Sequence, residues 1–388
     1  MVADLAVRLE ALRAAWKRPG LRATVWQMLA AGLVLAAALW LWGNITGNLT
    51  RRNLDIDFRF LGARASFEFG ENLVGYRPGD TFLSAFLAGL ANTALVAVFG
   101  IVLTTMVSAM LALMRLSPNR LARNVAWLWI EVVRNTPLLL QLLFWHQLMI
   151  RQLPGPRLAW ELLPDVFLSN RGLYFPAAMA QPAFGQAVLA LLFGVALAWG
   201  ARRILPEGKR GFAWLAVLGP PLLVLALLAD PVEVTRPALR GFNFSGGVSL
   251  SPEFVALLVA LVVYQSGFMA ETIRSGILGV AKGQNEAAAS LGLRRGQAMR
   301  LVVFPQALRI IIPPVTSQFL SLTKNSSLAV VIGYPDLVRV SQVTISETGR
   351  AVECITILLL VYLSLSLVTA LVMNLYNRRV MARGGGAR

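Results

Sequence analysis

The stretch GQNEAAASLGLRRGQ, residues 283–297, lies between two strongly apolar runs of the chain and is too polar to sit in lipid. Asn285 is able to cap a helix N-terminus, and Glu286 follows where a negative charge meets the positive end of the helix dipole. Three alanines then favour helix, and Gly292 is able to take the left-handed conformation that ends one. The sequence predicts a helix of about two turns with small side chains. Such a helix would either dock in a groove of another protein or be a connecting loop that happens to be rich in alanine.

The composition around this stretch is that of a membrane protein. Hydrophobic residues make up 57% of the 388 residues and charged residues only 14%, and the mean hydropathy is +0.65. A soluble domain carries about 25% charged residues. Continuous apolar runs of this kind predict an all-α polytopic membrane protein and not a β-barrel. We expect about eight transmembrane helices, at residues 25–45, 84–113, 124–149, 184–201, 212–229, 254–273, 303–323 and 352–376.

The charges predict the orientation of the chain. The formal net charge is +17. With the N-terminus in the cytoplasm, the basic excess falls in segments on that side, as the positive-inside rule expects. Both termini and residues 283–297 are then cytoplasmic. Short basic loops at a membrane face also account for the pI near 11.3, so we expect membrane lipid and no nucleic acid as a partner.

Scarce residue types exclude several kinds of chemistry. Cys354 is the single cysteine and His146 the single histidine, so we expect no internal disulfide, no metal site and no catalytic residues. The phosphate-binding pattern G-x-x-x-x-G-K-S/T is absent from the sequence. The chain is therefore not expected to be an enzyme or to hydrolyse ATP itself.

Three motifs resemble a known family. Residues 282–314, KGQNEAAASLGLRRGQAMRLVVFPQALRIIIPP, are similar to the EAA loop of permease subunits of ATP-binding-cassette (ABC) importers. EVVRNTPLLLQLLF (131–144) and FLSLTKNSSLAVVIGYPDL (319–337) resemble segments of the polar amino acid permeases. The extra first span and the long insertion resemble the longer, Q-type permeases of general L-amino acid importers. Asn135 stands where the family more often has glycine.

The resemblance implies a division of the chain into five parts. Residues 1–81 would hold a cytoplasmic N-terminus, the extra first helix and a periplasmic loop. Residues 82–149 would form the first part of a type I importer permease core, and residues 253–376 its second part, with the EAA loop at 276–305. Residues 150–252 would insert periplasmic loops and a transmembrane hairpin. Residues 377–388 would be a cytoplasmic tail.

The resemblance also implies a function and partners. The chain would move L-amino acids across the bacterial inner membrane, from periplasm to cytoplasm, by alternating access. It would bind no cofactor directly, because a partner ABC ATPase homodimer would use the ATP. A second, paralogous permease subunit and a periplasmic amino acid-binding protein would complete the assembly. The residues implied to contact the ATPase are Glu286, Ala287, Ala288, Ser290, Gly292 and Pro305.

Candidate residues for the substrate pathway lie at two polar interruptions of apolar runs. Near the first, Arg134 would meet a substrate carboxylate or form a self-neutralising pair with Glu131, and Pro137 predicts a kink. At the second, the chain forms either a broken helix or a simple external loop. The candidates are Glu131, Arg134, Asn135, Thr136, Gln141, Lys324, Asn325, Ser326 and Ser327.

Two other functions compete with that of an ABC importer. A secondary amino acid transporter driven by an ion gradient would need intramembrane carboxylates, and Glu131 is the plausible one. A membrane assembly or sensor protein without transport activity is the other.

Overall fold

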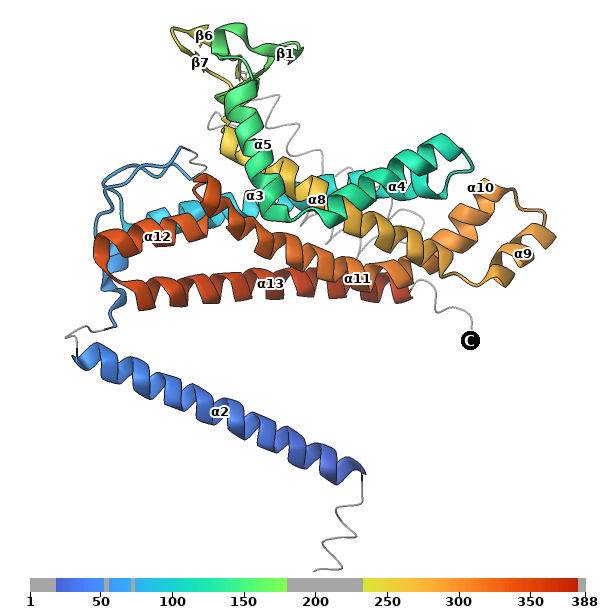
Figure 1. Cartoon of the computed structure of the whole chain (residues 1–388), viewed down its shortest axis with the longest axis horizontal. Coiled ribbons are helices and arrows are strands. Elements are labelled where there is room, and N and C mark those ends of the chain that lie inside the picture. Colours follow the sequence, from blue (N-terminus) through green and yellow to red (C-terminus); the bar gives the residue numbers. More distant parts are fainter. Residues whose placement is uncertain (1–18, 52–55, 71–73, 180–232, 383–388) are drawn as a thin grey trace, which may run out of the picture. The chain divides into compact units, whose positions relative to one another are not determined.

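The computed structural model describes residues 19–51, 56–70, 74–179 and 233–382, and the chain divides into two compact units, Met1–Phe60 and Leu61–Arg388. The first unit holds α2 (Pro19–Arg51), one long helix (Figure 1). Its stretch Arg22–Asn48 is long and apolar enough to cross a bilayer, and its leucine and tryptophan side chains are exposed. This helix matches the expected span at 25–45.

The described residues contain five helices that are long and apolar enough to cross a membrane. Besides α2, these spans are built on α3 (Phe82–Leu116), α8 (Pro252–Leu278), α11 (Phe304–Asn325) and α13 (Ala351–Ala382). The expectation of a polytopic helical membrane protein is thereby confirmed. The expected spans at 184–201 and 212–229 lie outside the described residues.

The span expected at 124–149 is wrong as a single helix. It consists of α4 (Arg120–Asn135) and α5 (Leu138–Gln152), which diverge from a break (Figure 1). Pro137 lacks an N–H donor and disfavours helical geometry in the preceding residue. Thr136 accordingly has an extended backbone with φ −104° and ψ 126°. Each piece is only about 23 Å long, short of a ~30 Å hydrocarbon core.

Helix α8 lies at the centre of the second unit and packs against α3, α4, α5 and α11. A hydrophobic cluster at the α3–α5–α8 junction includes Leu142, Leu257 and Tyr334. Polar pairs also link the helices, since the Gln265 Nε2 on α8 donates to the Gln318 Oε1 on α11. The other elements are attached at the ends of this helix bundle.

A second break follows α11. The helix changes at Ser326 into the 3₁₀ segment η5 (Ser326–Ile332), which ends at Gly333 with φ +82°. The chain is therefore helical from Phe304 to Ile332, with a change from α to 3₁₀ geometry where the broken helix was expected and without a loop at that point. Helix α12 (Leu337–Thr348) then begins with Asp336 as its N-cap and packs on α3.

Short strands form within the loops that were expected in residues 150–252. Tight turns explain the strands. Asp165 (φ 64°) lies in the first turn, and Gly172 (φ 122°) directly follows the second turn as the first residue of its strand. The main sheet has the order β1-β2-β3-β8, and β4–β5 and β6–β7 pair separately. The strands are β1 (Trp160–Leu163), β2 (Val166–Ser169), β3 (Gly172–Phe175), β4 (Ala177–Met179), β5 (Glu233–Thr235), β6 (Ala238–Arg240), β7 (Asn243–Ser245) and β8 (Val248–Leu250). Two short 3₁₀ helices, η1 (Phe58–Gly62) and η2 (Pro156–Leu158), complete the described elements outside the loop between α8 and α11.

Candidate functional site

The short helix expected near Glu286 is present as α9 (Lys282–Ser290), at the end of the bundle opposite α12 (Figure 1). It begins three residues before Asn285, so the expected capping by Asn285 is wrong. Ala281 is the N-cap, and its backbone oxygen accepts from the Gln284 N–H (3.0 Å). Glu286 therefore lies in the middle of the helix and not in its first turn.

Helix α9 ends just before the glycine that was expected to take a left-handed conformation. Gly292 has φ +74°, and the Leu293 N–H bonds back to the Ala288 oxygen at 3.1 Å, as in a Schellman motif. Leu291, just before this glycine, is 80% exposed, the largest value among the large apolar side chains that the structure describes. Leu291 was not among the residues expected from the sequence, although its place beside the glycine turn could have indicated it.

Helix α9 is tied to the bundle at few points. Ala288 is buried, while Glu286, Ala287 and Ser290 are exposed. The Gln306 Nε2 on α11 donates to the Gln284 Oε1 at 2.9 Å. Between these helices the chain forms α10 (Arg295–Ala298) and a short π-helix, η4 (Met299–Val303), and Pro305 lies in the first turn of α11. Helix α9 is therefore exposed, has small side chains and is attached to one end of a transmembrane helix, α11.

The polar candidates near the break between α4 and α5 form hydrogen bonds to backbone carbonyl oxygens around that break. The Asn135 Nδ2 donates to the Glu131 oxygen (2.7 Å), and the Thr136 Oγ1 donates to the Val132 oxygen (2.7 Å). The Gln141 Nε2 bridges the break by donating to the oxygens of Val133 (3.0 Å) and Thr136 (3.1 Å). These side chains donate to backbone carbonyls in the last turn of α4 and in the break itself, where the regular pattern of helical hydrogen bonds ends.

Arg134 and Glu131 do not form the self-neutralising pair that was one alternative. The Arg134 guanidinium lies over the Phe268 ring on α8, 5.2 Å from its centroid. The Glu131 Oε2 instead accepts from the Asn135 Nδ2 at 3.3 Å. Arg134 is exposed on the surface of the second unit, so its charge faces away from the subunit core.

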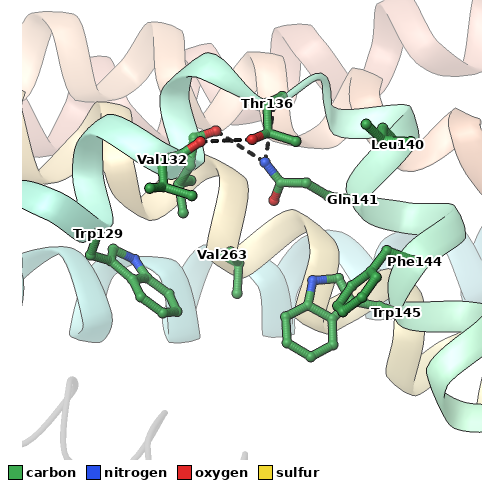
Figure 2. Close-up of a pocket in the computed structure, with 9 residues that line it drawn as sticks. Trp129, Val132, Thr136, Leu140, Gln141, Phe144, Trp145 and Val263 are labelled. Atoms are coloured by element: carbon green, nitrogen blue, oxygen red, sulfur yellow. Dashed lines mark hydrogen bonds between the residues drawn. The ribbon is translucent and has the colours of Figure 1, made fainter.

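An apolar cavity of about 460 Å³ adjoins this break (Figure 2). Of the sequence candidates, Thr136 and Gln141 line it, and the Gln141 carbonyl points toward the space between Trp145 and Val263 (Figure 2). The buried Gln141 Oε1 has no hydrogen-bond partner among the described residues. The other lining residues are Trp129, Val132, Val133, Leu140, Phe144, Trp145 and Val263.

The candidates at the second break lie around a different cavity. Lys324 and Ser327 line a space of about 470 Å³ between the α11–η5 junction, α12 and α13. The Ser326 hydroxyl is buried and donates to the Thr323 oxygen (2.7 Å), and Asn325 is partly buried. The two cavities share no lining residue, so the structure does not bring the two groups of candidates into one pocket.

A buried carboxyl group, which the sequence analysis missed, stands beside the second break. Asp336 is 1% exposed, and its Oδ1 accepts from the Arg339 N–H at 2.8 Å. Burial raises the pKa of Asp336 to about 7, against the lowering effect of the backbone N–H groups. No local pattern indicates this burial, because an aspartate after a proline normally indicates an exposed turn. Among the described residues, no three His, Cys, Asp or Glu side chains gather as a metal site would require.

Comparison with known proteins identifies the family. The family described as "Binding-protein-dependent transport system inner membrane component" matches residues 104–382, which include both breaks and α9. The chain belongs to this family.

Two relatives match nearly the whole chain. The putative amino-acid ABC transporter permease protein YhdX of Escherichia coli is 43% identical over 93% of this chain and 95% of its own length. The general L-amino acid transport system permease protein AapQ of Rhizobium johnstonii is 41% identical over 95% of this chain and 94% of its own. The resemblance to long ABC permeases is thereby confirmed.

A third relative has a narrower name. The glutamate/glutamine/aspartate/asparagine transport system permease protein BztB of Rhodobacter capsulatus is 35% identical over 91% of this chain and 92% of its own length. All three proteins are named as transport permeases, YhdX as an ABC transporter permease, and none of the three names supports a carrier driven by an ion gradient.

Proposed function

We propose that this protein is the permease subunit of an ABC importer that carries L-amino acids from the periplasm to the cytoplasm. The observation that carries the proposal is α9, an exposed helix of small residues that is fixed to the start of α11. Such a helix suits close contact with a second protein, because small side chains let two backbones approach. The names of the relatives support amino acids as the cargo.

The energy comes from a partner in this proposal. A pair of cytoplasmic ATPase subunits binds α9. The contact is made through Glu286, Ala287, Ser290 and the Gly292 turn, and Ala288 and Pro305 support it. For ATP to drive transport, the ATPase must hold α9 differently in the two packings of the bundle. No cofactor is bound by the permease itself.

Two further parts complete the assembly. A second, paralogous permease subunit shares the pathway, and a periplasmic binding protein delivers the amino acid. Both termini of this chain and α9 lie in the cytoplasm, in agreement with the positive-inside distribution of Lys and Arg.

The substrate path follows the two polar breaks. Arg134 and Lys324 are exposed within apolar surroundings, where a charge facing lipid would cost several kcal/mol. They therefore face an aqueous path or the second permease subunit. Polar side chains stabilise the backbone at both breaks. They are Asn135, Thr136 and Gln141 at the first break and Asn325, Ser326 and Ser327 at the second.

Reconstitution tests the proposal. The full complex in proteoliposomes, with the binding protein outside and ATP inside, is expected to take up labelled L-glutamine only when ATP is present. Uptake that proceeds without ATP and stops when a proton or sodium gradient is collapsed would overturn it and favour a secondary transporter. ATPase co-purification without any amino acid flux would favour a non-transporting assembly.

A further inference from the structure

A row of apolar side chains crosses the main sheet on one of its faces. Trp160 on β1 is opposite Leu168 on β2, and Leu168 is opposite Leu173 on β3. Leu173 is in turn opposite Leu250 on β8. Residues that stand opposite each other on neighbouring strands have side chains on the same face of a sheet. The four side chains therefore form one continuous apolar row from β8 to β1.

The helix bundle supports part of this row. Leu168 and Leu250 pack against the hydrophobic cluster at the α3–α5–α8 junction. The sheet lies beyond the end of α5 (Figure 1), and only Ser251 separates Leu250 from Pro252, the first residue of α8. Since α8 is long and apolar enough to cross a membrane, the apolar face of the sheet is held at the level where that span ends.

Strand β1 extends past this support. Neighbouring strands are about 4.8 Å apart, so Trp160 lies about 14 Å to the side of Leu250 and one strand beyond Leu168. Among the described residues β1 has no strand on its outer edge, and all four of its residues are exposed. Trp160 is 54% exposed, and Leu163, which is opposite Val166 on the same face, is 64% exposed. The outer end of the apolar row is therefore uncovered.

The surroundings favour lipid over a second protein as the cover. Helix α5 has exposed apolar side chains as far as Ile150 in its last turn. The exposed Arg151 follows, at a level where a cation meets lipid phosphate groups. Tryptophan is also enriched at this level of a bilayer. A binding protein that docks and leaves would expose the row to water in each cycle, whereas lipid covers it permanently.

We propose that β1 anchors the sheet to the bilayer, with its backbone in the headgroup layer and the side chains of Trp160 and Leu163 in the apolar layer below. The backbone sets the depth, because the open edge of β1 presents N–H and C=O groups that lipid tails cannot satisfy. The strand therefore stays among hydrated headgroups. The proposed function supplies only the side of the membrane, which is the periplasmic one.

Site-directed spin labelling of the assembled transporter tests the depth. Cys354, the single cysteine, is buried and is replaced by serine, and a nitroxide is attached at Leu163→Cys. The complex is placed in nanodiscs of phosphatidylethanolamine and phosphatidylglycerol. Collision with dissolved oxygen reports lipid, and collision with a water-soluble nickel chelate reports water. We expect high oxygen collision at this label and nickel collision severalfold lower than at a control label on the other face of the strand.

The matched control label is Glu161→Cys. Glu161 is exposed on the same strand and is opposite Phe167. The Phe167 ring stacks on Phe244 of the β6–β7 hairpin, 4.7 Å between centroids, so this face of the sheet is turned away from the apolar row. The label at Glu161→Cys should collide freely with nickel.

A charge placed in the row gives a second test. Trp160→Asp should raise nickel collision at the Leu163→Cys label severalfold, because a carboxylate is disfavoured in the apolar layer. Glu161→Gln is the control substitution and should leave that collision rate unchanged. A rate that Trp160→Asp does not move would show that Trp160 has no part in the anchor.

Three results would overturn the inference. Equal nickel collision at the two labels would mean that the row faces water. Exclusion of both oxygen and nickel from the Leu163→Cys label would mean that protein covers the row. Nickel exclusion that begins only when the binding protein is added would make the row a docking surface for that protein. ATP-driven uptake by the same complex is measured separately, so the proposed function stands or fails on its own result.

Discussion

The Gln306 Nε2 donates a hydrogen bond of 2.9 Å to the Gln284 Oε1, and this pair joins α9 to the first turns of α11. If α9 passes movement from an ATPase to the membrane, Gln306→Ala should loosen that connection. We expect ATP hydrolysis to continue while the number of amino acids imported per ATP falls severalfold. Paired measurements of uptake and phosphate release check this, with Gln342→Ala on α12 as the control. An unchanged ratio would mean that the pair has no part in coupling.

Charge and shape at α9 give a second prediction. Glu286→Lys reverses the one acidic charge of α9, and Gly292→Asp places a charged side chain at φ +74° just after the helix. Both variants should insert normally into the membrane and lose uptake. Gly296→Asp is the control, since Gly296 has an ordinary backbone conformation and open space around it. Transport at normal rates by both stably expressed variants would reject the coupling role.

The exposed Leu291 gives a third prediction. Burying one leucine at an interface contributes about 1.5 to 3 kcal/mol, so Leu291→Ala should weaken ATPase binding about tenfold or more. The thermal stability of the permease alone should not change, because the side chain is 80% exposed. Leu158→Ala, at a similarly exposed leucine far along the chain, is the control. Equal ATPase affinity in both variants would remove Leu291 from the contact.

The close packing of α12 on α3 leads to a fourth prediction. A Cβ at Gly89 would lie 2.7 Å from the Val340 Cγ2 and 3.1 Å from the Leu337 Cα. Backbone atoms cannot yield as a flexible side chain does, so Gly89→Ala should destabilise the protein by about 1 to 3 kcal/mol. Thermal unfolding of the detergent-purified protein measures this, with Gly296→Ala as the control. Equal melting temperatures would show that α12 shifts freely on α3.

The buried Asp336 predicts a pH dependence of stability. Its pKa is raised from 3.8 to about 7, so between these values the folded state holds a proton that the unfolded state has released. Stability therefore falls as pH rises from about 4 to 7, by at most about 4 kcal/mol. Asp336→Asn keeps an N-cap but cannot ionise, and should reduce this loss. The difference in melting temperature between the two proteins at pH 5.5 and 8 is the measurement, and a constant difference would contradict the prediction.

Much of the fold could be predicted from the sequence because apolar length alone identifies a bilayer span. The spans on α3, α8, α11 and α13 follow from this rule. Pro137 indicated a kink, but a proline does not reveal whether a helix bends or stops. The deciding interaction is the bridge from Gln141 to the two carbonyls of the break, which no local pattern reports.

The site was predicted less completely than the fold. Gly292 was correctly placed at a helix end, since left-handed geometry is a local property. The start of α9 was missed because backbone turns at Ala281, and not a side-chain cap, begin the helix. Tyr362 and Ser366 on α13, which line the cavity beside Lys324, were missed because residues within one apolar run give no sign of what they face across the bundle.

The pairing of β4 with β5 bears on how a chain of this length could have arisen. Met179 and Glu233 are opposite each other in an antiparallel ladder, so the main chain departs and returns at nearly the same point. Residues 180–232 could therefore be gained or excised during evolution with only a short hairpin turn to close the gap. Permease genes of quite different sizes could in this way encode the same arrangement of α5 and α8.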